Sequence, residues 1–426
     1  MKAVCDFHIH SKYSRATSRD MDLENLYKWA KIKGIKVLGT GDFTHPLWLR
    51  ELKEKLEPIG NGLLKFKSNQ QSTADNKQQI YFILTSEISC IYSKNNRTRK
   101  IHIIIFAPDF QTVEKINAHL GWIGNLKADG RPILGLDAKE LAKIVLNINP
   151  DCFIVPAHAW TPWFSIFGSK SGFNSIEECF DEFSKNIYAI ETGLSSDPAM
   201  NWRLSALDRI SLISNSDSHS PSRVGREANV FEIADIQNLS YRELISIVRE
   251  KNPQKFLYTI EFFPEEGKYH YDGHRLCQIR FSPEESKKHN NICPKCGKPL
   301  TIGVMNRVEE LADRKAGAKP ENVIPFKNLI PLEEIIADAV SQGVGTKMVT
   351  EYYKNLTTNL GNEFYILLEA SRSAIENFSN QEIAEGIMRV RDGKVKIEPG
   401  YDGEYGKIKI FEEGEQKGLS KQSSLF

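Results

Sequence analysis

The sequence predicts an α/β fold in which a large strand-and-helix domain is followed by a small cysteine-rich module and a mainly helical C-terminal domain. Residues 1–263 alternate short apolar runs with amphipathic segments, which is the pattern of repeated strand–helix units in a barrel-like α/β domain. Residues 264–304 are rich in His and Cys and show no helical or strand period. Residues 305–411 are predicted to form short helices and a hairpin, and residues 412–426 a polar, flexible tail.

The strands of the first domain are predicted from near-continuous apolar runs, which suit strands buried on both faces, as in parallel sheets. Asp22–Lys33 between the first two has a helical apolar stripe and is followed by Gly34, a natural helix end. Asn61–Gln79 is polar and is predicted to be a surface loop. The expected strands are Ala3–Phe7, Ile35–Gly39, Tyr81–Thr85, Ile101–Phe106, Cys152–Ala157, Ile187–Ile190 and Ile210–Ser214.

The C-terminal domain is predicted to be helical because apolar stripes at helical spacing alternate with Gly, Pro and Asn breaks. Residues Lys394–Phe411 alternate instead like a hairpin, around Pro399–Gly403. The expected helices are Arg307–Ala316, Leu332–Val340, Thr346–Asn355, Asn362–Asn377 and Gln381–Arg391.

Composition limits the class of protein. The 426 residues are 40% hydrophobic and 26% charged, which is typical of an ordinary globular chain of more than one domain. A net charge of +1 gives no bulk attraction to nucleic acid, so any such binding must come from local patches. No secretory signal and no apolar run of ~20 residues is visible, and the odd number of cysteines, 7, argues for reduced thiols. We therefore expect a cytoplasmic protein.

Metal-ligating side chains follow one predicted strand after another. The first strand runs into His8-Ile9-His10, whose two imidazoles share one face because side chains alternate with period two. A lone His at a strand end is more often a hydrogen-bonded core residue. So many buried polar groups at one end of a barrel would be costly without a compensating ion. The later strands end in or carry Asp42 and His45, Glu87, His102, His158, and Asp217-Ser218-His219.

The sequence therefore predicts a site for two to three divalent ions at the C-terminal ends of the strands, where α/β barrels place their chemistry. Mixed imidazole and carboxylate ligands suit zinc, manganese or iron, and magnesium is a further candidate. Asp6, Glu191 and Asp197 could be additional ligands or could orient the others.

These ordered motifs resemble those of the PHP (polymerase and histidinol phosphatase) family over roughly residues 1–261. The resemblance implies a distorted seven-stranded barrel with a trinuclear metal centre that hydrolyses phosphoesters. It also implies that all of the ligand-type residues named above serve catalysis. One departure is visible, because Asp42 and His45 are separated by Phe43-Thr44 where the family commonly has Asp directly followed by His. Which of the two binds metal is left open.

A second metal site is predicted in the cysteine-rich module. Cys293 and Cys296 have the Cys-x-x-Cys spacing of half a zinc knuckle, and Cys277 would add a third thiolate. This ligand set has no obvious open position, so we expect one structural zinc ion rather than a catalytic one. The fourth ligand is one of His270, Asp272, His274 and His289, of which His274 is favoured.

The order of barrel, zinc module and helical domain resembles the endonuclease Q family of DNA-repair nucleases over essentially the whole chain. The motifs that carry the likeness are 41–46, 156–163, 271–274, 293–297 and 399–404. The resemblance implies cleavage of the phosphodiester 5′ of a deaminated base (hypoxanthine, uracil or xanthine) or of an abasic site. A metal-activated water would leave a free 3′-hydroxyl. The alternatives are a small-molecule phosphoesterase acting on a nucleotide or histidinol-type phosphate, and a non-catalytic DNA-binding factor.

Several residues are candidates for substrate contact. Trp160 and Trp163, with Phe164 and Phe167, could form an apolar slot for a flipped nucleotide, or only an aromatic cluster at the barrel rim. Lys170 and Ser171 lie in the following loop, where an amide or hydroxyl could read the base. Either phosphate contact or plain surface charge would account for Arg15, Arg223 and Arg226, and for the basic residues Arg307, Arg314, Lys315, Lys347, Arg372 and Arg389 of the helical domain.

The tail ends in Gln422-Ser423-Ser424-Leu425-Phe426, which resembles short peptides that bind sliding clamps. Such a peptide suits a flexible tail because it can order on its partner. The expected partners are therefore DNA carrying damaged bases and a clamp of unspecified origin.

Overall fold

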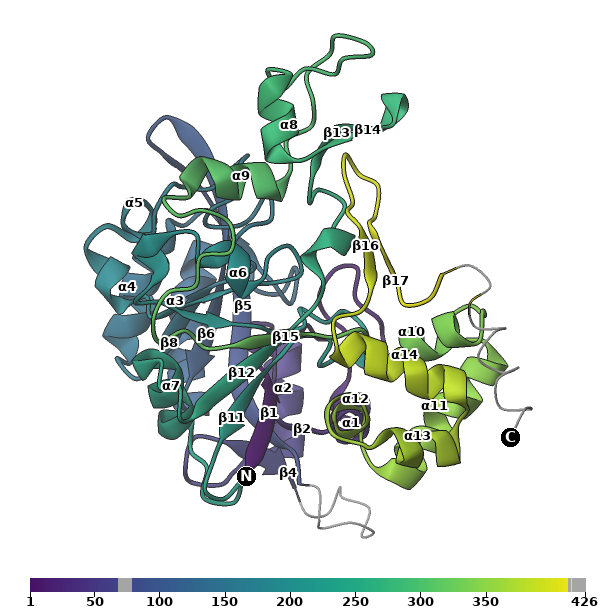
Figure 1. Cartoon of the computed structure of the whole chain (residues 1–426). Helices are drawn as coiled ribbons and strands as arrows, with labels where there is room; N and C mark the ends of the chain where they lie inside the picture. The colour runs from purple at the N-terminus through teal and green to yellow at the C-terminus, as the bar shows by residue number, and fades with distance from the viewer. Residues whose placement is uncertain (68–78, 413–414, 416–426) are drawn as a thin grey trace.

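The computed structural model describes residues 1–67, 79–412 and 415 (Figure 1). Its centre is an 11-stranded sheet ordered β15-β12-β11-β1-β2-β5-β4-β3, with β6 and β7 paired to β5 and β8 paired to β6. These strands are β1 (Lys2–Asp6), β2 (Ile35–Gly39), β3 (Leu56–Pro58), β4 (Leu64–Phe66), β5 (Tyr81–Lys94), β6 (Arg97–Ala107), β7 (Ile133–Leu134), β8 (Phe153–Pro156), β11 (Ala228–Glu232), β12 (Phe256–Glu261) and β15 (Phe326–Asn328).

The sheet is mixed, which corrects the expectation of a parallel one. Strands β1, β2 and β5 pair in parallel, but β5–β6, β6–β8, β1–β11 and β11–β12 are antiparallel. The reason at β5–β6 is local. Asn95 and Asn96 both have positive φ, 54° and 58°, and they close a two-residue hairpin between the paired Lys94 and Arg97. Strands β9 (Ala189–Glu191) and β10 (Ser211–Ile213) form a separate parallel pair.

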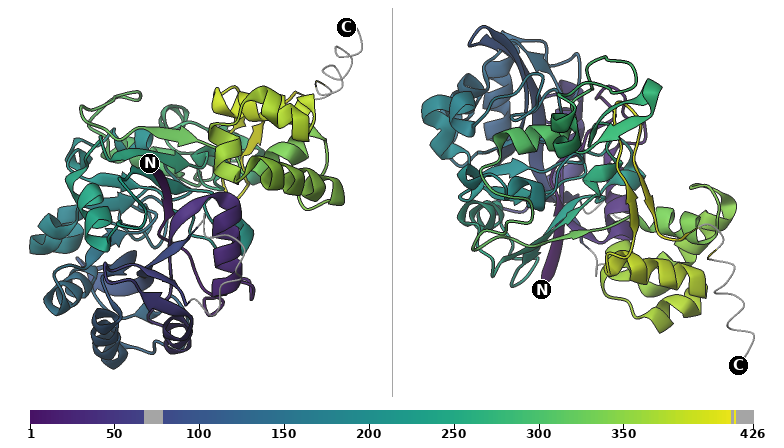
Figure 2. Two further views of the ribbon diagram at one scale, coloured as in Figure 1. Left: turned by 90° about the horizontal axis from the view of Figure 1, so that it is seen from below. Right: turned by 45° about the horizontal axis from the view of Figure 1, so that its top comes forward.

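Helices pack around this sheet (Figures 1 and 2). The first confirms its prediction: Asp22 accepts a hydrogen bond from the backbone of Asn25 as the N-cap, and Gly34 ends the helix at φ 93°. The helices of this domain are α1 (Leu23–Lys33), α2 (Pro46–Lys55), α3 (Phe110–Ile123), α4 (Ala138–Ile148), α5 (Ile176–Phe180), α6 (Pro198–Asn201) and α7 (Tyr241–Glu250).

Two apolar cores form because strand side chains alternate between faces. On β1 and just beyond it, Ala3, Cys5 and Phe7 enter one core, where the Phe7 ring meets Phe106 at 5.5 Å. The thiols expected to be small buried hydrophobes are confirmed as buried and free: Cys5, Cys90, Cys152 and Cys179. His8 and His10 alternate with core residues, so they leave the end of the strand on the face opposite to Phe7.

The cysteine-rich module projects from the sheet domain at the top of Figure 1. It contains β13 (Asp272–His274), β14 (Ile279–Phe281) and α8 (Pro283–Lys288), and α9 (Val304–Leu311) follows it. The predicted C-terminal hairpin, β16 (Lys396–Glu398) with β17 (Lys407–Lys409), is confirmed and reaches the module through its loop. Asp402 accepts hydrogen bonds from the Arg275 backbone at 2.7 Å and the Thr301 hydroxyl at 2.6 Å, so the loop ties the module down.

The C-terminal helices are α10 (Leu332–Ala339), α11 (Lys347–Leu360), α12 (Glu363–Leu368), α13 (Arg372–Phe378) and α14 (Gln381–Arg391). The prediction of α14 is confirmed at both ends. The single helix expected over Asn362–Asn377 is wrong, because the chain breaks after Leu368. There Ser371 caps a new helix by accepting a hydrogen bond from the backbone of Ala374.

The basic residues expected to contact phosphates are largely paired within the protein. Arg307 is buried and donates to the carbonyls of Phe167 and Phe173, both at 3.0 Å, so it fastens α9 to the sheet domain. Arg314 pairs with Asp208 at 2.5 Å. Arg372 and Arg389 both pair with Glu385. These contacts favour a structural role for the arginines concerned.

A buried ion pair joins the sheet domain to the C-terminal helices. Lys33 Nζ lies 2.7 Å from Glu363 Oε2, and both side chains are almost fully buried. Glu363 also accepts hydrogen bonds from Tyr353 and from the backbone of Leu332. The carboxylate is therefore held by three donors from two domains.

Replacing Lys33 by methionine is expected to lower the free energy of unfolding of the helical domain by about 3 kcal/mol, because Glu363 would stay buried without its cation. Hydrogen exchange of residues 331–394 measures this local stability. Lys28→Met, on an exposed position of the same helix, is the matched control. Equal exchange in the two variants would contradict the prediction.

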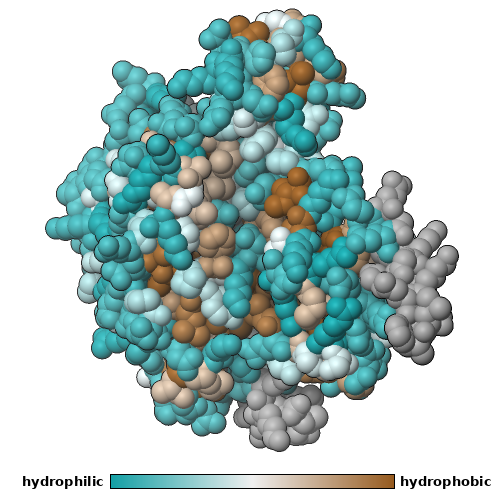
Figure 3. All heavy atoms as spheres, in the orientation of Figure 1, coloured by the Kyte–Doolittle hydropathy of each residue, from teal (hydrophilic) through white to brown (hydrophobic). Residues whose placement is uncertain are grey.

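Among the residues that the structure describes, no helix is long and apolar enough to cross a bilayer. The face in Figure 3 is mostly hydrophilic, with apolar side chains showing in its middle and lower part and at the projecting top. The predicted clamp-binding peptide, residues 422–426, lies outside the described residues.

Candidate metal centre

The first and last predicted motifs lie side by side. Ile9 forms a parallel bridge with Ser218, and the His10 backbone donates to the Ser218 carbonyl at 3.0 Å. This pairing brings the imidazoles that follow β1 to the carboxylate that follows β10. His10 Nε2 lies 3.1 Å from Asp217 Oδ1, and His8 Nε2 lies 3.7 Å from the same oxygen.

His8, His10 and Asp217 form a first cluster whose ligand atoms lie within 4.8 Å of one another. Their facing atoms, His8 Nε2, His10 Nε2 and Asp217 Oδ1, are buried and have no hydrogen-bond partner in the described part of the chain. Buried polar atoms without partners are rare and costly. A divalent cation would satisfy all three, so these residues fit the ion that the sequence predicts.

Glu87, His102 and His158 form a second cluster of the same size. His102 Nδ1 lies 2.8 Å and His158 Nε2 3.1 Å from Glu87 Oε1. The other oxygen, Oε2, lies 3.3 Å from His10 Nε2 in the first cluster. Glu87 therefore spans the two clusters, as a carboxylate that bridges two ions would.

Two carboxylates behind the first cluster orient its imidazoles. His8 Nδ1 lies 3.0 Å from both oxygens of Glu191, and His10 Nδ1 lies 3.0 Å from Asp42 Oδ1. A hydrogen bond at Nδ1 leaves Nε2 with its lone pair toward the cluster. Glu191, one of the residues left open by the sequence, is thus placed as an orienting group.

Asp42, His45 and His219, predicted as ligands, lie around the two clusters but belong to neither of them. The Asp42 carboxylate contacts His10 and accepts hydrogen bonds from the hydroxyls of Ser11 and Ser14, contacts that suit a group that orients His10. His45 is stacked on Tyr13 with ring centroids 4.4 Å apart. His219 Nδ1 is bonded to the Asp217 carbonyl at 2.9 Å, with its ring 4.6 Å from His10.

Asp6 and Asp197, the other residues left open, have local structural contacts. Asp6 accepts hydrogen bonds from the backbones of Ser216 and Gly225, at 3.1 and 2.9 Å. Asp197 caps α6 by accepting one from the Met200 backbone at 2.8 Å. Neither carboxylate lies in a cluster of the described residues.

The backbone is strained at three of the predicted ligands. Asp42, His158 and Asp217 have φ values of 47°, 29° and 45°, in the region that non-glycine residues rarely adopt. Such conformations cost on the order of 1–3 kcal/mol each and persist where the surroundings impose them, often at functional sites. The strain supports a functional reading of these strand ends.

Attraction between the imidazoles and the carboxylates shifts the pKa values of most groups in the two clusters. Burial alone would lower the pKa of His8 and of His10, but the neighbouring carboxylates raise both well above the ordinary value. Burial would likewise raise the pKa of Glu87, yet the charges of His102, Arg131 and His8 hold it well below its usual range. His102 is different, because burial lowers its pKa to about 4 despite the attraction of Glu87. Protons on the first-cluster imidazoles would compete with a cation.

Sequence reasoning missed Arg131, whose Nη1 lies 3.0 Å from Glu87 Oε2. The residue lies in the loop between α3 and β7, within Asp129-Gly130-Arg131-Pro132. That tetrapeptide is a turn signal and does not indicate a site. Only the folded loop brings Arg131 to Glu87.

A cavity of about 500 Å³ opens beside the second cluster. Its lining includes His102, His158 and Asp217 from the clusters, facing Trp163, Phe164 and Tyr269. The cavity therefore offers aromatic surface directly next to the candidate metal ligands.

The predicted aromatic slot is only half present. Trp160 is buried, packs on Phe167 at 4.9 Å, and donates its indole N–H to Asn201 at 2.8 Å. This placement corrects the expectation that Trp160 contacts substrate, because its ring lies in the core. Trp163 is 43% exposed and does line the cavity with Phe164.

The remaining substrate candidates are scattered. Ser171 is buried and supports the loop, donating to the Lys100 carbonyl and accepting from the Phe164 backbone, both at 3.2 Å. Lys170 is exposed, and its side chain has no recorded partner in the described structure. Three arginines already have partners: Arg15 lies 3.3 Å from Asp129, Arg223 pairs with Glu334, and Arg226 donates to the Ser216 carbonyl at 3.1 Å.

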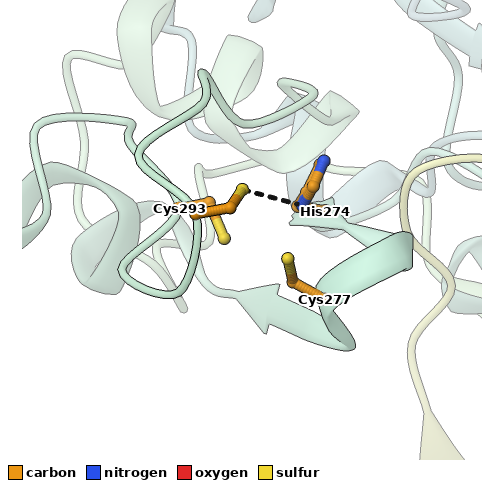
Figure 4. A group of neighbouring side chains, drawn as sticks. His274, Cys277 and Cys293 are labelled. Carbon is orange, nitrogen blue, oxygen red and sulfur yellow. Dashed lines mark hydrogen bonds between the residues drawn. The ribbon is translucent and has the colours of Figure 1, made fainter.

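The cysteine-rich module gathers the ligands favoured by the sequence. His274, Cys277, Cys293 and Cys296 have ligand atoms within 4.8 Å of one another, and Cys296 Sγ lies 3.5 Å from His274 Nδ1. Figure 4 shows the side chains of His274, Cys277 and Cys293 converging from the end of β13 and the loop beyond α8. The alternatives do not join this cluster: His270 is buried beside Tyr271, and Asp272 accepts from the Gly303 backbone at 2.6 Å. His289 stacks on Phe281 at 4.9 Å.

A mixed α/β fold that gathers buried imidazoles and carboxylates into neighbouring clusters is typical of a metal-dependent hydrolase. The crystal structure of the lesion-specific endonuclease PfuEndoQ from Pyrococcus furiosus matches the chain with a TM-score of 0.84 and 31% identity, over 97% of this chain and 96% of that one. The chain belongs to the endonuclease Q family. A structure of Endonuclease Q complexed with a 27-mer duplex substrate, with an abasic lesion at the active site, matches at a TM-score of 0.82 and 31% identity, over 97% and 98%.

Other relatives are described as uncharacterized proteins. YqxK of Bacillus subtilis (strain 168) is 26% identical over 428 residues, covering 96% of this chain and 99% of YqxK. MJ0043 of Methanocaldococcus jannaschii is 35% identical over 255 residues, which cover 59% of this chain but only 31% of MJ0043. A family model described as the MJ0043 C-terminal domain matches residues 331–394, the region of α10–α14.

Proposed function

We propose that the protein is a metal-dependent DNA endonuclease that cuts the phosphodiester 5′ of an abasic site or of a deaminated base (hypoxanthine, uracil or xanthine), leaving a 3′-hydroxyl. One observation carries the proposal: two ligand clusters share Glu87 and open on a cavity lined by Trp163 and Phe164. Family membership supports it, because the related Endonuclease Q complex holds an abasic duplex at its active site.

His8, His10 and Asp217 would hold one divalent ion, and Glu87, His102 and His158 a second. His219, Asp42 and His45 are nearby candidates for a third, so the proposed count is two to three ions of zinc, manganese, magnesium or iron. When bound, such ions lower the pKa of a water to near neutrality and neutralise phosphate charge. The protein's own part is orientation: Glu191 and Asp42 keep the Nε2 atoms of His8 and His10 directed into the site. No nucleophilic side chain is needed.

The cavity beside the clusters is proposed to hold the nucleotide at the lesion. Bound metal ions would contact phosphates and carry no information about the base, so lesion choice must come from the cavity walls. Trp163, Phe164 and Tyr269 offer aromatic faces for a flipped base or sugar. Because an abasic sugar needs little unstacking, it would be the least costly nucleotide to extrude.

The proposed domains are 1–263, 264–304, 305–411 and the tail 412–426. The first would correspond to the distorted PHP-type barrel, formed by the large sheet together with the β9–β10 pair. One structural zinc on His274, Cys277, Cys293 and Cys296 would stabilise the module. The helical domain is proposed to contact DNA, and residues 422–426 a sliding clamp.

End-labelled duplexes that carry an abasic site, hypoxanthine, uracil, xanthine or no lesion test the proposal. The metal-loaded protein is expected to nick the lesion duplexes on the 5′ side and to spare the unmodified one. The variant His8→Ala should lose this activity. Intact lesion duplexes, with turnover of histidinol phosphate instead, would contradict the proposal and favour a small-molecule phosphoesterase.

A further inference from the structure

Arg131 is the charged residue of the site to which no motif assigns a role. Its Nη1 donates to Glu87 Oε2 at 3.0 Å, and its side chain remains 26% exposed. Within residues 1–67, 79–412 and 415, no other lysine or arginine pairs with a predicted metal ligand. A single fixed cation therefore touches the carboxylate that spans both clusters.

The turn that carries Arg131 is packed directly on the first motif. The Gly130 backbone donates to the Tyr13 carbonyl at 3.0 Å. A Cβ at position 130 would lie 2.2 Å from Asp42 Oδ2 and 2.3 Å from Ser14 Oγ, so only glycine fits. This close approach fixes the backbone just before Arg131.

On its other side the turn is tied to the strand that carries Glu87. The Pro132 carbonyl accepts a hydrogen bond from the Ser89 backbone at 3.0 Å, and β7 pairs in parallel with β5. Arg131 thus emerges between two anchored points. The direction of its guanidinium is set by the fold, as expected of a group that must meet a ligand in one geometry.

The Arg131 guanidinium has N–H groups that form no hydrogen bond in the described structure. It carries five N–H groups in a planar fork, and Glu87 takes one of them. No other side-chain hydrogen bond of Arg131 is formed in the described structure. A guanidinium stays protonated in proteins, so the group is a fixed cation. None of the three arginines first expected to hold phosphate contacts a cluster residue in the described structure: Arg15 pairs with Asp129, Arg223 pairs with Glu334, and Arg226 donates to the Ser216 carbonyl.

We propose that Arg131 binds a non-bridging oxygen of the scissile phosphodiester through its free N–H groups while its Nη1 holds Glu87. The assignment rests on the proposed endonuclease function. A fork can serve a carboxylate and a phosphate at once, whereas a lysine ammonium acts as a point charge. The fixed cation would stabilise the charge that builds on the phosphoryl oxygens during attack.

The test compares Arg131→Gln and Arg131→Lys with the full-length wild type on an abasic duplex. The scissile phosphate carries sulfur in place of one or the other non-bridging oxygen, and single-turnover rates and bound metal are measured. We expect Arg131→Gln to cut the normal duplex about 10²- to 10³-fold more slowly. Its metal content should be unchanged, and the rate difference between the two sulfur diastereomers should change, because one non-bridging oxygen would lose its guanidinium partner. Arg131→Lys should lie in between.

Arg242→Gln is the matched control, because Arg242 forms a similar ion pair with Asp151 at 2.8 Å on the exposed surface of α7. It should behave as wild type. The assignment is overturned if Arg131→Gln loses metal in parallel with rate, since Arg131 would then only position Glu87. It is equally overturned if the diastereomer difference is the same as in the wild type. A wild-type protein that leaves the abasic duplex intact would instead remove the proposed function itself.

Discussion

Replacing Glu87 by glutamine is expected to reduce nicking of an abasic duplex by more than about 10³-fold, beyond the 10- to 100-fold typical of changes to a residue behind the ligands. Glu87 is the residue on which both clusters depend. One oxygen faces His102 and His158, and the other faces His10 and Arg131. Glutamine keeps the shape but removes the charge, and an amide nitrogen would replace one ligand oxygen.

Metal content and cleavage should fall together in this variant. Elemental analysis of the purified protein is expected to show fewer bound ions than the wild type, with an unchanged circular dichroism spectrum. Glu177→Gln is the matched control, because Glu177 pairs with Arg209 on the surface. A Glu87→Gln protein with full metal content and wild-type cleavage would show that the two clusters are not the active site.

The sequence predicted the clustered ligands because each follows or lies in a strand, and strand ends meet at one edge of a sheet. The argument holds for His8, His158 and Asp217, which follow β1, β8 and β10. It is wrong for Glu87, because β5 does not end near Thr85 but continues to Lys94 and carries Glu87 in its middle. It could not separate ligands from orienting groups. Asp42 and Glu191 differ from the clustered residues only in which neighbours reach their oxygens, and tertiary contacts alone decide that.

Strand direction was predicted less well, for a physical reason. Long apolar strands are buried on both faces whether their neighbours are parallel or antiparallel, so hydrophobicity does not reveal direction. The turn Asn95-Asn96 carried the missing signal, since paired residues of positive φ close a tight hairpin. The same limit applies to Trp160 and Trp163, which lie three residues apart. Trp160 is buried on Phe167, whereas Trp163 lines the cavity. Because both residues are tryptophan, their side chains alone do not reveal which one is buried.

Replacing Cys293 by serine is expected to release the structural metal and to loosen the module without emptying the barrel site. A zinc ion held by these four residues, with no open position, would contribute folding energy to residues 264–304. Zinc binding requires deprotonated thiols. Burial raises the pKa of Cys293, but the backbone N–H groups of Lys295 and Cys296 bring it down to about 7. The pKa of Cys277 shifts the other way, because burial and the neighbouring thiols raise it to about 11. Protons therefore compete more strongly as pH falls, and zinc should dissociate on acidification.

Loss of the zinc site should also weaken DNA binding, because the module holds the hairpin loop in place. The Asp402 side chain of the hairpin loop accepts hydrogen bonds from the Arg275 backbone and the Thr301 hydroxyl of the module, so unfolding of the module would also release the tip of the hairpin. Cys293→Ser should lose one zinc per chain, expose residues 268–300 to protease, and bind the lesion duplex more weakly. Lys298→Ala, an exposed change in the same loop, should do none of these. If Cys293→Ser kept its zinc and its protease resistance, the thiolates would not be holding the module together, and its fold would have to rest on the hairpin contacts alone.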